Sequence, residues 1–251
     1  MDYDKLIAPA AEAMRPSGIR KFFDLAAEMP ECISLGVGEP DFKTPWAVRE
    51  AGIESLEHGR TRYTSNAGLK ELRAEISRYL ERRMNLRYDP MRQILVTVGG
   101  SEAIDLTIRA LVKPGDEVII PAPYWVSYPE MVRMCGGIPV IVETTAENGW
   151  KLTAEQFEEA MTPRTKMVIL TTPNNPTGSV YSEEELRHLI EPAKLAGLGV
   201  HMDGARLANA VAAGFDLKDI PRLGVDILVF GGAKAGANCA EALVIFDKSL
   251  T

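Results

Sequence analysis

The sequence predicts an α/β fold: a three-layer αβα arrangement around a mostly parallel seven-stranded sheet. From residue 94 onward, short apolar and β-branched runs alternate with helical segments, which is typical of βα units. The connections between runs are long enough for crossover helices except before the last run, which we expect to be antiparallel. The seven expected strands are 94–98, 117–121, 138–142, 167–171, 198–202, 227–230 and 242–246.

The first part of the chain is expected to be helical. Residues 1–30 predict an N-terminal helical segment in two pieces, and Pro45–His58 and Gly68–Met84 predict two longer helices. Tyr63 lies in an irregular polar segment between these two helices. Because we find no internal repeat, low-complexity tract or linker, we expect residues 31–251 to form one sheet-centred domain.

Composition excludes several kinds of partner. The chain has 251 residues, of which 46% are hydrophobic, and its formal net charge is -7. Without a dense Lys/Arg cluster, nucleic acid and anionic membrane surfaces are not expected as partners. The N-terminus has early acidic residues and the chain has no apolar run that could span a bilayer, so we expect a cytoplasmic protein. Cys32, Cys135 and Cys239 lack metal-ligand spacing and are expected to be reduced, so no metal site is predicted.

The segment Asp226–Gly236 combines an apolar run with glycines around one lysine. Ile227–Phe230 shows no polar alternation, which suits a strand that is covered on both faces. Lys234 then follows the carboxyl end of this strand, where α/β sheets bind ligands. Desolvation there can make its amine a nucleophile, and the chemistry suggested is a Schiff base. The alternative is a solvated loop lysine, because strand-to-glycine turns are common.

Other expected strand ends carry groups that could serve the same bound molecule. The first strand is followed by Gly99, Gly100, Ser101 and Glu102 at the start of a helix, whose free amides could hold a phosphate. Alternatively, Ser101 is only the N-cap of that helix and the glycines shape the turn. Trp125, which follows the second strand, could stack on an aromatic ligand or belong to the core.

Two further strand ends carry polar side chains. Asn174 and Asn175 follow the strand at 167–171 and could be turn formers and nothing more. Asp203 ends the next strand, and its carboxylate needs a partner, which could be Arg206 or a protonated ring nitrogen of a ligand. His201 shares the strand face of Asp203 by alternation, and we expect a hydrogen-bonded core histidine there rather than a catalytic one.

The motifs along the chain fall into two groups. The first group is Gly36-Val37-Gly38-Glu39-Pro40-Asp41-Phe42, Tyr63, Gly99-Gly100-Ser101-Glu102-Ala103, Tyr124-Trp125 and Pro173-Asn174-Asn175-Pro176-Thr177-Gly178. Through these motifs, residues from about 30 to 195 resemble class I aminotransferases of the bacterial aspartate aminotransferase kind. The second group is His201-Met202-Asp203-Gly204-Ala205-Arg206-Leu207-Ala208-Asn209-Ala210, Phe230-Gly231-Gly232-Ala233-Lys234 and Glu241-Ala242-Leu243-Val244-Ile245-Phe246. Through it, residues from about 198 to 247 resemble low-specificity L-threonine aldolases.

Both families share the type I fold of pyridoxal-phosphate enzymes, and the change of resemblance near Leu195–Gly199 suggests a chimera. The resemblance implies that Lys234 forms the Schiff base with pyridoxal 5'-phosphate, and that Asp203 pairs with the protonated ring nitrogen, which makes the ring an electron sink. It further implies that Trp125 stacks on the ring. Asn175, as in the aminotransferases, and Arg206, as in the aldolases, would both reach the phenolic oxygen.

The remaining implied roles concern the phosphate and the substrate. Amides of Gly100, Ser101 and Glu102 at the helix start would hold the phosphate. Tyr63 matches a tyrosine that crosses a dimer interface to the phosphate of the neighbouring subunit, so a homodimer is expected. Gly38 matches the loop beside the substrate carboxylate.

The sequence departs from the aminotransferase pattern in two places. Residues 236–242 contain no basic residue where aminotransferases carry an arginine on the phosphate. By the same resemblance, we expect this chain to lack the C-terminal small domain with the carboxylate-binding arginine. We therefore expect an aminotransferase-like domain acting on an amino acid and a keto acid, impaired by truncation, with Lys234 also moving the α-proton. The alternatives are aldol cleavage of β-hydroxy amino acids and an inactive engineered scaffold.

Overall fold

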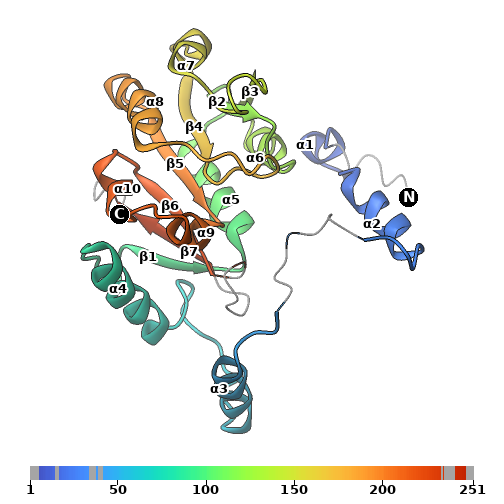
Figure 1. The fold of residues 1–251 in the computed structure, drawn as a ribbon, viewed down its shortest axis with the longest axis vertical. Coiled ribbons are helices and arrows are strands. Elements are labelled where there is room, and N and C mark those ends of the chain that lie inside the picture. The colour runs from blue at the N-terminus through green and yellow to red at the C-terminus, as the bar shows by residue number, and fades with distance from the viewer. Residues whose placement is uncertain are drawn as a thin grey trace.

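A seven-stranded sheet forms the centre of the molecule (Figure 1). The computed structural model describes residues 6–14, 17–33, 38, 42–232, 234 and 241–246. The strands are β1 (Ile94–Thr97), β2 (Glu117–Ala122), β3 (Ile138–Glu143), β4 (Thr165–Thr171), β5 (Gly199–Gly204), β6 (Ile227–Gly231) and β7 (Glu241–Ile245). All seven predicted strands are therefore confirmed, with bounds that differ from the predicted ones by at most two residues.

The sheet order is β1-β7-β6-β5-β4-β2-β3, and β7 is the strand that runs against the others. It pairs antiparallel with both β6 and β1, whereas β3, β2, β4, β5 and β6 pair in parallel. The antiparallel direction of the last strand is confirmed, and the connection from β6 is too short for a crossover helix. Six strands consequently end at one edge of the sheet, which we call the carboxyl edge.

Helices cover both faces of the sheet, as a three-layer αβα fold requires (Figure 1). One face packs against α5 (Gly100–Leu111) and α6 (Tyr128–Met134). The other packs against α4 (Lys70–Met84), α7 (Ala154–Ala160), α8 (Glu183–Leu195), α9 (Leu207–Ala212) and α10 (Asp219–Arg222). The buried residues alternate between the two faces along each strand: on β5, Val200 and Met202 face α8 and α9, so His201 and Asp203 face α5 and α6.

Three N-terminal helices lie outside these layers. Figure 1 shows α1 (Pro9–Glu12) and α2 (Ile19–Ala27) near α6, whereas α3 (Trp46–Glu57) projects away from the sheet. No residue of α3 is buried, and its Trp46 and Leu56 side chains are exposed. The division of the chain at residue 30 stays a prediction. Among the described residues, no helix combines the length and the apolar character needed to cross a bilayer.

Two buried carboxylates lie at the opposite edge of the sheet, where the parallel strands begin and which we call the amino edge. The carboxylate of Asp226, just before β6, accepts hydrogen bonds from the Val200 amide at 2.8 Å and from Lys194 Nζ at 2.5 Å. Glu117, the first residue of β2, accepts hydrogen bonds from Thr162 Oγ1 at 2.6 Å and from Arg164 Nε at 2.9 Å. The Thr162 hydrogen bond and the Arg164 charge lower the pKa of Glu117, although desolvation opposes this. Both carboxylates therefore have cationic partners.

Candidate active site at the carboxyl edge

Two glycines bring the ends of β5 and β6 into direct backbone contact. A Cβ at Gly204 would lie 2.5 Å from the Val229 carbonyl oxygen, and a Cβ at Gly231 would lie 2.6 Å from Ala205 Cα. Real side chains do not tolerate such distances, so glycine is required at both positions for this packing. The end of β5, which contains Asp203 and is followed by Arg206, therefore lies beside the end of β6, which Lys234 follows.

Asp203 is half-buried and is held by two neutral donors. The Ala205 amide donates to Oδ1 at 2.9 Å, and the Tyr128 hydroxyl donates to Oδ2 at 2.6 Å. Of the two partners expected for this carboxylate, Arg206 makes no ion pair with it among the described contacts. Among the described contacts, Asp203 is thus oriented by neutral donors, and no cationic side chain is hydrogen-bonded to it.

Tyr128 is the residue of this cluster that the sequence prediction missed. It begins α6, is 2% exposed, and also lies 3.2 Å from Thr171 Oγ1 through its hydroxyl. Burial, the nearby charge of Asp203 and the hydrogen bond to it raise the pKa of Tyr128 well above its usual value. It is therefore a permanent hydrogen-bond donor. Its position three residues after Trp125, at a helix start next to the sheet edge, was the available signal.

Lys234 follows β6 and has an exposed side chain whose pKa is lowered. Partial loss of hydration is the main cause, and the Arg206 guanidinium lowers the pKa further by repulsion. The carboxylates of Asp203 and Glu241 act in the opposite direction. A lowered pKa increases the fraction of uncharged amine near neutral pH, which is the nucleophilic form.

Arg206 is half-buried and precedes α9 as its N-cap residue. Its Nη2 atom lies 3.3 Å from the position that a Cβ at Gly38 would occupy. The predicted substrate glycine and the predicted cofactor arginine therefore lie against each other. Together with the effect of Arg206 on Lys234, this contact places Gly38 at the same edge of the sheet.

Ser101 is not the N-cap residue of α5, although the sequence allowed that alternative. Gly99, at φ 87° and ψ 159°, is the N-cap residue, and in this described helix no side chain caps the first amides. Ser101 and Glu102 are exposed, and the Glu102 carboxylate accepts a hydrogen bond from the Val98 amide. Gly100 lets the helix start pack on β6, since a Cβ there would lie 3.2 Å from Val229 Cγ1. The interpretation of Ser101 as N-cap is wrong because the glycine before the helix already occupies that position.

The other predicted site residues differ in how far their side chains are exposed. Trp125 is half-buried and packs beside the core on the α5 and α6 face. Asn175 is half-buried, whereas Asn174 is buried and its Nδ2 donates to the Pro123 carbonyl at 3.3 Å, which ties this loop to the end of β2. Tyr63 is fully exposed, with a relative exposure of 108%.

His201 lies in the core, but the prediction that it is hydrogen-bonded is wrong. The residue is 1% exposed, and within the described part of the chain neither ring nitrogen has a hydrogen-bond partner. Its strand neighbours are Ile169 and Ile227, which offer no polar group from their side chains. Burial lowers the pKa of His201 to about 4, against an opposing effect of Asp203. The imidazole is therefore neutral near neutral pH.

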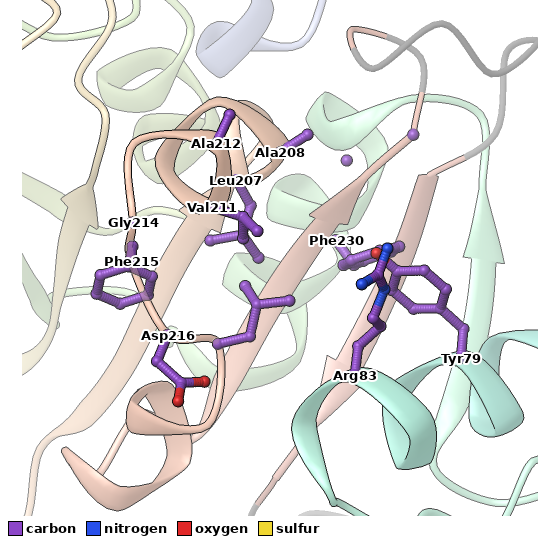
Figure 2. A pocket seen from close by; sticks show the side chains of 13 residues that line it. Tyr79, Arg83, Leu207, Ala208, Val211, Ala212, Gly214, Phe215, Asp216 and Phe230 are labelled. Carbon is purple, nitrogen blue, oxygen red and sulfur yellow. The ribbon is translucent and has the colours of Figure 1, made fainter.

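An apolar hollow lies next to this site but on the other face of the sheet. Figure 2 shows Tyr79 and Arg83 of α4 on one side of it, and α9 with the segment that follows on the other. Its volume is about 670 Å³, and Phe230 lies between the two sides. Gly231 and Gly232 reach the hollow, but Asp203, Arg206 and Lys234 are not among its lining residues. The polar cluster and the hollow are therefore separate features.

Among the described residues, no group of three or more His, Cys, Asp or Glu side chains could hold a metal ion. What the carboxyl edge offers instead is a lysine with a lowered pKa, an oriented carboxylate, an arginine and the uncapped start of a helix.

The αβα fold is similar to that of solved aspartate aminotransferases. A solved aspartate aminotransferase from Thermus thermophilus, crystallised with maleate, has a TM-score of 0.85 and 34% identity over 97% of this chain and 65% of its own. The family model for aminotransferases of class I and II matches residues 30–205. The chain belongs to the class I and II aminotransferase family.

Named relatives agree with this assignment. "Putative aminotransferase YugH" of Bacillus subtilis (strain 168) is 60% identical over 183 residues, which are 73% of this chain and 47% of that protein. The aspartate aminotransferase of Geobacillus stearothermophilus is 41% identical over 201 residues, which are 78% of this chain and 51% of that protein. The chain thus spans about half the length of these curated relatives.

The comparisons give no support to a threonine aldolase segment or to a chimera. The family match continues past the expected junction at Leu195–Gly199 and includes β5 and Asp203. The solved aspartate aminotransferase, moreover, covers nearly the whole chain. A single aminotransferase architecture therefore accounts for the fold on both sides of that junction.

Proposed function

We propose that this chain is the pyridoxal-phosphate-binding part of an aminotransferase, which moves an amino group between an amino acid and a keto acid. The observation that carries the proposal is that two groups, an amine and a carboxylate, both lie at the carboxyl edge of the sheet. Lys234 has an amine with a lowered pKa, and Asp203 has a carboxylate that Tyr128 and the Ala205 amide orient. Membership of the class I and II aminotransferases supports the same cofactor.

The residues present fit this cofactor chemically. When bound, pyridoxal phosphate supplies an aldehyde that an amine can attack and a ring that accepts electrons once its nitrogen is protonated. The Lys234 amine would attach to the aldehyde and would later accept and return the proton at the substrate carbon. The Asp203 charge would hold a proton on the ring nitrogen, because a carboxylate favours a nearby cation.

Other residues would position the cofactor. Trp125, half-buried at the end of β2, would stack on the ring, and Asn175 would donate a hydrogen bond to the phenolic oxygen. The amides of Gly100, Ser101 and Glu102 would bind the phosphate, which is consistent with the uncapped start of α5.

The substrates are proposed from the relatives. Several of them are named aspartate aminotransferases, and one solved relative is described with the dicarboxylate maleate. Acidic amino acids and their keto acids are therefore the first substrates to try. The widely spaced cysteines, which lack metal-ligand spacing, are the basis for proposing a cytoplasmic location.

A homodimer is proposed because Tyr63 faces away from its own chain. A tyrosine that served its own site would be partly covered, yet Tyr63 is fully exposed, and α3 beside it buries no residue. Both features suit a surface that a second copy covers. Sedimentation at increasing concentration should give a closed dimer, and Tyr63→Phe should weaken cofactor binding. A monomer that binds the cofactor tightly would rule out this arrangement.

The central proposal is tested by trapping. Pyridoxal phosphate is added, the product is reduced with borohydride, and peptide mapping locates the label. We expect it on Lys234, with loss in Lys234→Ala and no loss in Lys113→Ala, which removes an exposed lysine elsewhere. Label spread over surface lysines in proportion to their number would show that the site assignment is wrong.

Two alternatives arise from the sequence of residues 198–247 and from its departures. One is aldol cleavage of β-hydroxy amino acids, and the other is a folded scaffold without activity. Product analysis distinguishes transamination from aldol cleavage: glutamate and a keto acid indicate transamination, whereas glycine and an aldehyde indicate aldol cleavage. A chain that attaches no cofactor at Lys234 would be the scaffold.

A further inference from the structure

We infer that Glu241 is a positioning residue for Lys234, an inference that rests on the proposed function. Its carboxylate fixes the backbone that leads to the lysine. Its charge also favours the ammonium form of the lysine, which exists after the amine has taken the α-proton of a substrate. Glu241 begins β7, and the sequence alone predicted no role for it.

Glu241 lies between two strand ends at the carboxyl edge of the sheet. In the strand pairing it is opposite Gly231 at the end of β6 and Thr97 at the end of β1. Leu243, two residues further along β7, belongs to the core on the α5 and α6 face. By alternation, Glu241 therefore shares the sheet face of Asp203.

The Glu241 carboxylate is tied to the segment that carries Lys234. Its Oε2 atom accepts a hydrogen bond from the Gly232 amide at 3.1 Å, and Gly232 is two residues before Lys234. Glu241 is 5% exposed, and burying a carboxylate is costly unless hydrogen bonds or charges compensate the lost hydration. The hydrogen bond to Gly232 therefore holds the exit from β6 against the start of β7, and it fixes the backbone from which Lys234 extends.

The Lys234 amine is subject to charges of both signs. Partial burial lowers the pKa of Lys234 most, and the Arg206 guanidinium lowers it further. The carboxylates of Asp203 and Glu241 raise it. In the proposed function, Asp203 serves the ring nitrogen of the cofactor, whose positive charge would offset that of the carboxylate. Glu241 is then the carboxylate that still favours a positive charge on Lys234 Nζ.

This charge bears on the proton that Lys234 is proposed to move. The amine accepts the proton from the substrate carbon and stays an ammonium ion until the proton is returned. A nearby carboxylate stabilises the ammonium ion, which makes the amine a stronger base. The same charge reduces the fraction of free amine before the cofactor attaches. The two effects have opposite signs, which a purely structural brace between β6 and β7 would not produce.

The experiment measures the reactivity of Lys234 in the unloaded protein. Trinitrobenzenesulfonate modifies uncharged amines, and peptide mass spectrometry follows the modification of Lys234 as the pH is varied. Glu241→Gln keeps an oxygen for the Gly232 amide but removes the charge. The rate of modification at neutral pH should therefore rise by about 3- to 10-fold, and the pH profile should move to lower pH. With the cofactor and an amino acid added, the rate of α-proton exchange should fall instead.

Two further variants separate the charge from the hydrogen bond. Glu143→Gln removes an exposed carboxylate at the end of β3, at the other end of the strand order, and should change neither rate. Glu241→Ala removes the charge and the hydrogen bond together. Attachment of pyridoxal phosphate to Lys234 should then be about 3- to 10-fold slower than in Glu241→Gln, the value of one hydrogen bond. Glu241→Gln is the decisive variant, because its shape and its hydrogen bond preserve the fold.

The contrary outcomes are equally defined. Modification of Lys234 that is unchanged or slower in Glu241→Gln would overturn the inference, and so would an equal change in Glu143→Gln. Proton exchange that does not fall while modification becomes faster would contradict the role in proton transfer. Failure of the original protein to attach the cofactor at Lys234 refutes the proposed function instead. The modification rates of the unloaded protein then still decide whether Glu241 acts on Lys234.

Discussion

The carboxylates at the two edges of the sheet have different hydrogen-bond partners. At the amino edge, Asp226 and Glu117 are buried and hydrogen-bonded to the cations of Lys194 and Arg164. At the carboxyl edge, Asp203 is held by neutral donors only. A carboxylate neutralised inside the protein stabilises the fold but has little charge left for a ligand. One that is oriented without being neutralised can bind a cationic group from outside.

The largest expected effect concerns the unneutralised carboxylate. Asp203→Asn keeps the shape of the side chain but removes the charge that would hold a proton on the cofactor ring. We expect the rate of α-proton exchange in an amino acid to fall by about 100-fold or more, as for the loss of an electrostatic group at a reacting centre. The exchange is followed by NMR in heavy water with the cofactor-loaded protein.

The free energy of unfolding of the Asp203→Asn variant serves as the control for this prediction. The free energy of unfolding of Asp203→Asn should stay within about 1 kcal/mol of the original, because the Ala205 amide can still donate to the amide oxygen and the Tyr128 hydroxyl can accept from the new NH2 group. Arg206→Ala should slow the exchange less than Asp203→Asn when the amino acid is saturating. Equal losses in the two variants would mean that Asp203 is only a structural residue.

An aspartate-to-asparagine substitution at the amino edge of the sheet should reduce the stability of the fold instead of the rate of proton exchange. Asp226→Asn removes the partner of Lys194 and weakens the hydrogen bond from Val200, so unfolding should become easier by about 2 kcal/mol. Lys194 is 41% exposed and can rehydrate, which limits the cost. Urea denaturation measures the change. A loss of stability no larger than that of Asp203→Asn would remove the distinction between the two edges.

His201, on the same face of β5 as Asp203, should make stability depend on pH. Its folded pKa of about 4 lies below the value near 6.5 of an unfolded histidine, so the unfolded chain binds a proton first as the pH falls. Stability contributed by the neutral ring is therefore present above pH ~6.5 and decreases toward pH ~4, by at most ~1.4 kcal/mol per pH unit. Urea unfolding of His201→Phe should show a smaller slope in this window. An identical slope would mean that other groups cause the acid sensitivity.

The smallest expected effect is that of the Tyr128 hydroxyl. Tyr128→Phe removes one of the two donors to Asp203, so cofactor affinity should fall by about 3- to 10-fold, the value of one hydrogen bond. Tyr181→Phe is a matched control, because it removes a buried hydroxyl that accepts a hydrogen bond from the Leu152 amide, away from Asp203. It should cost stability without changing cofactor affinity. A similar loss of affinity in both variants would indicate a general effect on the core.

The sequence by itself determined the elements and the main groups of the candidate site. Strand positions, the antiparallel last strand, and the places of Asp203 near the end of β5 and of Lys234 after β6 all follow from patterns within a few residues. Side-chain alternation and connection length are local properties, and they can be read without a structure.

Only the tertiary structure decided which side chains meet. The hydrogen bond from Tyr128 to Asp203 joins residues 75 positions apart, and Arg206 contacts Gly38 from a still more distant part of the chain. Whether Ser101 caps its helix, and whether a buried histidine finds a partner, depended on neighbours that folding alone supplies. Such contacts follow from strand order and packing, which bring distant segments together and leave no periodic signal in the sequence.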